Sequence, residues 1–226
     1  MHSPKPGQGR PLNTSYAGEA DSDLLPAYVL HTETTYQHSH SVYLSGFIGD
    51  SLEYADLFIA LRSAGPADQF LFYLNTPGGS LDTGLQLIHS VQASEARVTM
   101  ILDPQASSMG ALLFLCGDDV SVPPYSSLMF HNYSAELGMR KGHEQFAAVR
   151  AFTDTYRKVL ERVCQPFLTF DEISGIQKGQ DLWLDSDEIL RRFAKLNKQS
   201  SSTQKAKPAR LARLADSPTK GEQNAD

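Results

Sequence analysis

Two adjacent serines at a predicted strand-to-helix junction are the first residues whose type and position suggest chemistry. Ser107 and Ser108 follow the largely apolar segment 97–102, which predicts a buried strand. The apolar segment after them ends at Gly117 and predicts a short buried helix. A hydroxyl at a helix N-terminus lies beside unpaired backbone N–H groups, which favour a developing negative charge. The junction therefore predicts either a serine nucleophile beside an oxyanion site or a serine that only caps the helix.

A second turn of the same kind occupies residues 75–80, with the sequence NTPGGS. Gly78 and Gly79 lack a Cβ, so the backbone there can expose its N–H groups. The lysine of a phosphate-binding loop is absent. Since both turns follow predicted parallel strands, we expect them at the same end of a sheet. One turn can supply a nucleophile and both can supply oxyanion donors.

A histidine and an aspartate complete the candidate chemistry. His131 ends a short predicted strand, where it is either a core histidine or a general base. A general base needs an acid to fix its tautomer, and Asp181 is the best-placed candidate. Asp185 and Asp187 are interpreted as helix caps instead. Spacing alone does not establish that these side chains meet Ser108.

The elements that must position these residues alternate between strands and helices. Strands are predicted at residues 28–30, 41–48, 70–74, 97–102, 120–122 and 127–131. Helices are predicted at 50–63, after Ser80, at 111–116, over 141–163, after Thr169 and from about 186 to Phe193. In the first helix, Ala55, Phe58, Ile59 and Leu52 are expected to face inward. The alternation predicts an α/β fold of βαβ units, with a largely parallel sheet covered by helices.

Length and composition divide the 226 residues into three parts. Residues 1–27 are a polar arm or removable leader, 28–194 form one domain, and 195–226 form a basic tail expected to be disordered. The net charge of −6 excludes a dedicated nucleic-acid binder, and no segment is long and apolar enough to span a membrane. Two cysteines in apolar segments predict reduced core thiols and a cytoplasmic protein. The histidines at 31, 38 and 40 lack a convergent fourth ligand, so no metal is expected.

Four segments, taken in order, resemble the Clp protease proteolytic subunit family, ClpP. They are NTPGGSLDTG at 75–84, QASSMGA at 105–111, PPYSSLMFHN at 123–132 and DLW at 181–183. The resemblance covers residues 40–195. It implies the ClpP/crotonase fold, with repeated βαβ units and residues 141–163 as a protruding handle helix.

By this resemblance the candidate residues receive roles. Ser108 matches the nucleophile, His131 the base and Asp181 the orienting acid, while the backbone N–H groups of Gly79 and Met109 match the oxyanion hole. The implied activity is that of an ATP-dependent Clp protease proteolytic subunit, a serine endopeptidase in an oligomeric chamber. A polypeptide is the implied substrate, a homo-oligomeric ring the implied assembly, and no metal or organic cofactor is needed. An AAA+ unfoldase partner is left open.

The chain departs from the family pattern in three places, which leaves alternatives open. The N-terminal arm shows no clear match to the axial-loop segment of the family. Gly179 and Gln180 replace the Asp-Arg pair that links opposing ClpP rings, and residues 132–138 replace the Gln-Pro and Gly-Gly pattern of the substrate channel. The alternatives are a bacteriophage head-maturation protease of the same fold, a non-catalytic ring or scaffold subunit, and a crotonase-type acyl-CoA enzyme. A Ser–Lys peptidase is disfavoured, because no lysine lies in the turn elements near Ser108.

Overall fold

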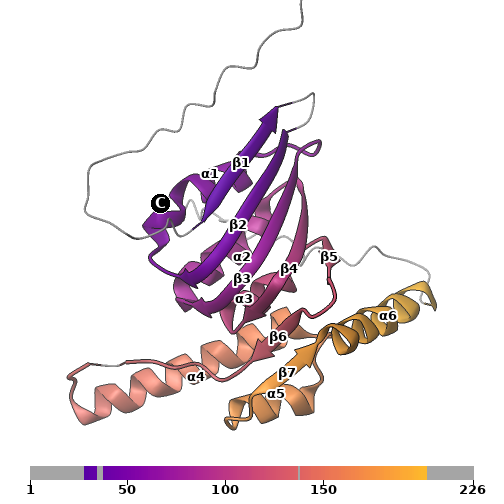
Figure 1. The fold of residues 1–226 in the computed structure, drawn as a ribbon. Helices are drawn as coiled ribbons and strands as arrows, with labels where there is room; N and C mark the ends of the chain where they lie inside the picture. Colours follow the sequence, from indigo (N-terminus) through magenta and orange to yellow (C-terminus); the bar gives the residue numbers. More distant parts are fainter. Residues whose placement is uncertain (1–27, 35–37, 137, 203–226) are drawn as a thin grey trace, which may run out of the picture.

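The computed structural model describes residues 28–34, 38–136 and 138–202, and this part of the chain contains one seven-stranded sheet (Figure 1). The strands are β1 (Val29–Thr34), β2 (His38–Ile48), β3 (Gln69–Gly79), β4 (Arg97–Ser107), β5 (Asp119–Ser121), β6 (Ser127–Phe130) and β7 (Leu182–Asp185). The helices are the 3-10 turn η1 (Ser51–Tyr54), then α1 (Ala55–Ser63), α2 (Leu81–Ala93), α3 (Met109–Phe114), α4 (Gly142–Cys164), α5 (Phe170–Gln177) and α6 (Ser186–Ser202).

The sheet is parallel at its centre and antiparallel at both edges. Its order is β1-β2-β3-β4-β6-β7, and β5 also pairs with β4. The pairs β2–β3, β3–β4, β4–β5 and β4–β6 are parallel, whereas β1–β2 and β6–β7 are antiparallel. The predicted α/β class with a largely parallel sheet is confirmed. None of the helices in the described ranges has the length and apolar character to cross a membrane.

One face of the central strands carries the core. Figure 1 shows α1, α2 and α3 on one side of the sheet, and α3 contacts both β3 and β4. The even-numbered residues of β3 from Phe70 to Thr76 are buried, whereas Leu71 and Tyr73 are only half-buried. Among the described residues, α1, α2 and α3 cover this face of the sheet, so the prediction of a sheet covered by helices is confirmed for this face. On the other face, the rings of Tyr43 and Tyr73 stack with centroids 4.7 Å apart.

The expected buried face of the first helix is right for Phe58 and wrong for its other residues. Ala55, Ile59 and Leu52 are exposed, and Ile59 keeps 65% of its surface. The element begins with the tighter turn η1, and α1 follows from Ala55. Asp50 caps this turn as predicted, accepting a 2.8 Å hydrogen bond from the Leu52 N–H. The buried side chains are Tyr54, Leu57, Phe58 and Leu61.

The long helix α4 projects from the body of the molecule (Figure 1). It covers almost the predicted range, but only the second half of its apolar face is buried. Tyr156, Leu160 and Cys164 are buried in its second half, while Phe146 in its first half is 81% exposed. The first half therefore contributes little to the core of this chain.

The last two helices begin where the sequence predicts, but the final one is longer than predicted. Thr169 and Glu172 form the expected capping box of α5, and Asp185 accepts a 2.8 Å hydrogen bond from the Glu188 N–H at the start of α6. The predicted end at Phe193 is wrong, because α6 continues to Ser202 and Leu196 packs against the core. The tail was expected to be disordered from residue 195, but residues 195–202 belong to α6. The arm at 1–27 and the rest of the tail, 203–226, lie outside the described residues.

Candidate active site

The two turns singled out in the sequence meet at one end of the sheet. β3 and β4 are parallel neighbours, and Thr76 pairs with Ala106 just before each strand ends. Parallel neighbours end on the same side, so the glycines at the end of β3 lie next to the junction between β4 and α3. The two segments lie at the same end of the sheet as expected, but residues 75–79 are the last part of β3 and residues 105–107 the last part of β4, so most of each segment is strand and not turn.

Ser108 connects β4 to α3 in an unusual backbone conformation. Its φ of 54° and ψ of −121° lie in a region that residues other than glycine rarely adopt. It occupies the N-cap position of α3, yet its hydroxyl makes no capping hydrogen bond. Its backbone N–H donates to the Met129 carbonyl at 2.8 Å, which fixes the turn against β6. A serine that only caps the helix would use its hydroxyl for that purpose, so the capping interpretation does not describe Ser108.

Gly78 brings the first turn into contact with the second. Its φ is +94°, and a Cβ built there would lie 2.7 Å from the Ser108 Cβ and 2.9 Å from the Met109 nitrogen. Gly79 has a φ of +154°, and a Cβ there would lie 2.2 Å from the Ile48 carbonyl oxygen. Both positions therefore require glycine, because any side chain would push the backbone of this turn away from its neighbours.

Met109 is the first residue of α3, so its N–H belongs to the helix N-terminus, where intrahelical partners are absent. The structure thus places Met109 beside the glycine turn that contains Gly79. The role of the two N–H groups as an oxyanion hole stays a prediction.

His131 and Asp181 flank the same end of the β6–β7 ladder. β6 and β7 are antiparallel, and Phe130 pairs with Leu182 at the end of the ladder. His131 directly follows Phe130 and Asp181 directly precedes Leu182, so both residues stand just beyond the end of the ladder. His131 is half-buried and Asp181 is exposed.

The pairing of β4 with β6 brings Ser108 close to the end of β6, which His131 follows. Ser107 pairs with Met129, two residues before His131, and the Ser108 N–H bonds to the same residue. The segments that carry Ser108, His131 and Asp181 are therefore brought together. Within the residues that the structure describes, no hydrogen bond links these three side chains, and no group of three His, Cys, Asp or Glu could hold a metal ion.

The backbone of His131 is held by a residue that the sequence did not single out for the site. The Tyr156 hydroxyl, on α4, donates a 2.8 Å hydrogen bond to the His131 carbonyl. The neighbouring Asn132 amide donates to the Gln177 carbonyl at the end of α5, at 3.1 Å. Sequence reasoning counted Tyr156 only as part of an apolar helix face. The hydroxyl of Tyr156 bonds to a backbone carbonyl, and every residue type has one, so the sequence does not indicate this contact.

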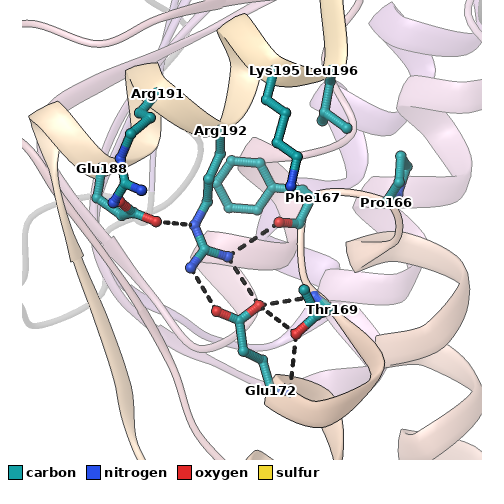
Figure 2. Close-up of a pocket in the computed structure, with 9 residues that line it drawn as sticks. All are labelled: Pro166, Phe167, Thr169, Glu172, Glu188, Arg191, Arg192, Lys195 and Leu196. Carbon is teal, nitrogen blue, oxygen red and sulfur yellow. Dashed lines mark hydrogen bonds and ion pairs between the residues drawn. The ribbon is translucent and has the colours of Figure 1, made fainter. Parts of the chain in front are cut away.

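A cavity of about 290 Å³ lies apart from these residues, between α5 and α6 (Figure 2). Arg192 bridges the two helices there, with 2.6 Å contacts to Glu172 and Glu188 and a 3.2 Å hydrogen bond to the Phe167 carbonyl. Burial opposes ionisation of Glu172, but hydrogen bonds from Arg192 and Thr169 outweigh it and lower the pKa of Glu172 to about 2. These contacts join the two helices that flank β7, the strand next to Asp181.

The sheet order, the layer of α1, α2 and α3 on one face and the projecting α4 define an α/β protein of the ClpP fold. The chain belongs to the Clp protease family, whose sequence model matches residues 39–165, more than half of its length. It is 28% identical over 148 residues to ATP-dependent Clp protease proteolytic subunit 1 of Protochlamydia amoebophila, covering 63% of this chain and 70% of the relative. The subunit of the same name from Frankia casuarinae is 26% identical over 153 residues, covering 65% of this chain and 70% of the relative. At this modest identity the chain is a divergent, ClpP-like peptidase.

Proposed function

We propose that the chain is a serine endopeptidase that hydrolyses peptide bonds with Ser108, His131 and Asp181. The observation that carries the proposal is the conformation of Ser108, which stands at the start of α3 with a hydroxyl that does not cap the helix. A strained serine at a strand-to-helix turn exposes its Oγ beside helix N–H groups. The pairing of β6 with β4 and β7 supports a base and an acid at the same place.

In the proposed reaction, His131 takes the proton of the Ser108 hydroxyl as Oγ attacks the peptide carbonyl carbon. The N–H groups of Gly79 and Met109 stabilise the resulting oxyanion, each donor contributing about 3–4 kcal/mol. Asp181 holds the imidazole in the required tautomer and stabilises the imidazolium. The C–N bond then breaks, His131 gives its proton to the leaving amine, and water hydrolyses the acyl-enzyme.

We also propose that the chain works as a homo-oligomeric ring that encloses a chamber. Two exposed apolar surfaces support assembly. One lies on the sheet face opposite α1, α2 and α3, where Phe47 is 67% exposed, and the other on the first half of α4, where Phe146, Val149 and Phe152 are exposed. An isolated protein rarely leaves surfaces of this kind in water. The free thiols of Cys116 and Cys164 support an assembly that acts in the cytoplasm.

The test is labelling with a fluorophosphonate serine probe, followed by mass spectrometry of the modified peptide and by assays on short peptides. Wild type should be modified at Ser108, and Ser108→Ala should lose both labelling and hydrolysis while keeping its circular dichroism spectrum. Ser107→Ala is the matched control, because Ser107 is the adjacent residue but ends β4 as a buried side chain. Hydrolysis that survives in Ser108→Ala would refute the assignment. A folded wild type that neither labels nor cleaves peptides would favour the non-catalytic scaffold.

A further inference from the structure

We infer that Tyr156 is a positioning residue for His131, acting through the backbone of the general base. This inference rests on the proposed function, since it concerns the base of that reaction. It assigns a role to a side chain on α4 that lies outside the three candidate catalytic residues.

The hydrogen bond from Tyr156 is well placed for this role. The Tyr156 side chain is 6% exposed, and its hydroxyl lies 2.8 Å from the His131 carbonyl oxygen. Burial raises the pKa of the Tyr156 phenol, so the hydroxyl stays protonated and remains a donor throughout the working range of a histidine base. The bond crosses from α4 to the residue after β6 and spans 25 positions of sequence.

His131 needs such support because the sheet ladder stops before it. β6 ends at Phe130, which makes the last pair with β7. The backbone of His131 therefore depends on side chains for its position. A base must stay within hydrogen-bond reach of the hydroxyl that it deprotonates, and a displacement of about 1 Å can cost 10²-fold in rate.

The ring of Tyr156 is itself held in place. The Tyr133 ring packs edge-on against it, with centroids 5.7 Å apart. The Tyr133 hydroxyl contacts the Thr153 hydroxyl at 2.8 Å, one turn earlier on α4. The segment of residues 131–133 is thus fastened to α4 at two points, and only the bond from Tyr156 reaches His131 itself.

These two tyrosines provide a matched pair for the test. Tyr156→Phe removes the donor to His131, whereas Tyr133→Phe removes a hydroxyl that bonds to the same helix without contacting His131. For Tyr156→Phe we expect kcat on a short peptide to fall about tenfold, with KM within twofold of wild type. The rate of fluorophosphonate labelling should fall by a similar factor. Tyr133→Phe should stay within twofold of wild type in each.

The pH profile separates positioning from a loss of stability. A base held less well opposite Asp181 loses stabilisation of its imidazolium, so the acid limb of kcat/KM for Tyr156→Phe should shift to lower pH. Thermal unfolding is measured alongside, and all rates are taken below the transition. An unshifted profile with unchanged kcat would overturn the inference. An equal loss of kcat in Tyr156→Phe and Tyr133→Phe would also overturn the inference, because it would show that any weakening of the contact with α4 lowers the rate.

The same experiment distinguishes this inference from the proposed function. If wild type is labelled at Ser108 and Tyr156→Phe behaves as wild type does, only the positioning role fails. If folded wild type shows no labelling and no hydrolysis, the proposed function fails and the positioning role is rejected with it.

Discussion

At the scale of single residues, the site depends on backbone positions that only particular residues can occupy. Ser108 has a positive φ, and its hydroxyl does not cap α3. Gly78 lies so close to Ser108 that the site has no room for a Cβ at this position. A strained residue of this kind persists only where its surroundings hold it, and such residues cluster at functional sites. The glycines at the end of β3 and the junction between β4 and α3 therefore act as one unit.

Replacement of Gly78 tests that unit. For Gly78→Ala we expect the free energy of unfolding to fall by about 2–3 kcal/mol, because the new Cβ meets backbone and is carried at φ +94°. Peptide hydrolysis should fall about 100-fold as the turn moves away from Ser108 and Met109. The control is Gly142→Ala, where nothing lies within 4 Å of the added Cβ. Urea unfolding and peptide assays measure both effects, and full activity in Gly78→Ala would contradict the close approach.

Asp181 gives a second prediction at this scale. Asp181→Asn should lower kcat by roughly 10³-fold while the fold is kept, because an amide holds the His131 imidazole in the wrong tautomer. Asp187→Asn is the matched control, since Asp187 is an exposed carboxylate in the first turn of α6. Steady-state kinetics on a short peptide make the comparison. An unchanged kcat for Asp181→Asn would remove Asp181 from the proposed triad.

The types of residue at the site could be read from the sequence, whereas their contacts could not. A serine pair before a helix and a Gly-Gly pair are local signals, and both segments lie at the same end of the sheet as expected. The bond from Tyr156 to the His131 carbonyl joins side chain to backbone across 25 positions and has no local signal. The positive φ of Ser108 is set by β6 and the glycine turn, so it too depends on tertiary contacts.

At the scale of elements, an ion-pair cluster ties α5 to α6. Arg192 contacts Glu172 on one helix and Glu188 on its own, and its guanidinium lies 5.6 Å from the centre of the Phe167 ring. These side chains are largely withdrawn from water, so their interactions are screened less than those of a surface pair. The two helices flank β7, and their docking fixes the strand that follows Asp181.

This cluster predicts an acid dependence of stability. Glu172 has a pKa of about 2 in the folded chain against an ordinary value of 4.5, so folding favours its ionised form. Its contribution is complete above about pH 4.5 and is lost as the pH falls towards 2. Glu172→Gln should therefore unfold more easily than wild type at pH 7, by about 1–2 kcal/mol after allowance for partial exposure. The difference should shrink between pH 4.5 and 2.

Urea unfolding at pH 7 and pH 3 measures this dependence. Glu136→Gln serves as the control, because Glu136 lies exposed in a loop away from α5 and α6. A deficit of Glu172→Gln that is as large at pH 3 as at pH 7 would contradict the linkage.

Element types and order could also be predicted from the sequence, and the errors have physical causes. The capping box at Thr169 and Glu172 is a local pattern, and it appears as expected. The buried face of α1 was wrong apart from Phe58, because a second apolar stripe with helical spacing, Tyr54, Leu57, Phe58 and Leu61, packs against the core. The end of α6 was wrong because Leu196 packs against the core, which overrides the polar composition of that stretch.

At the scale of the whole molecule, the exposed apolar surfaces predict assembly, and the departures from the family pattern limit its size. Gly179 and Gln180 stand where the resemblance places the ion pairs between rings, and neither side chain can form such a pair. We expect an assembly smaller or weaker than a stacked double ring. Light scattering with size exclusion, at low and at high salt, measures the mass. A double ring that persists at high salt would refute this expectation.

One consequence follows from the way a single sheet collects β4, β6 and β7. The three residues that we propose for catalysis, Ser108, His131 and Asp181, lie on or next to these neighbouring strands of one chain. We therefore expect each subunit to be an independent unit of activity. When wild-type and Ser108→Ala chains are mixed within one particle, turnover should decline in simple proportion to the inactive fraction. The activity of such particles would fall gradually as damaged subunits accumulate. In an enzyme whose sites are shared between partners, one damaged subunit would inactivate more than one site.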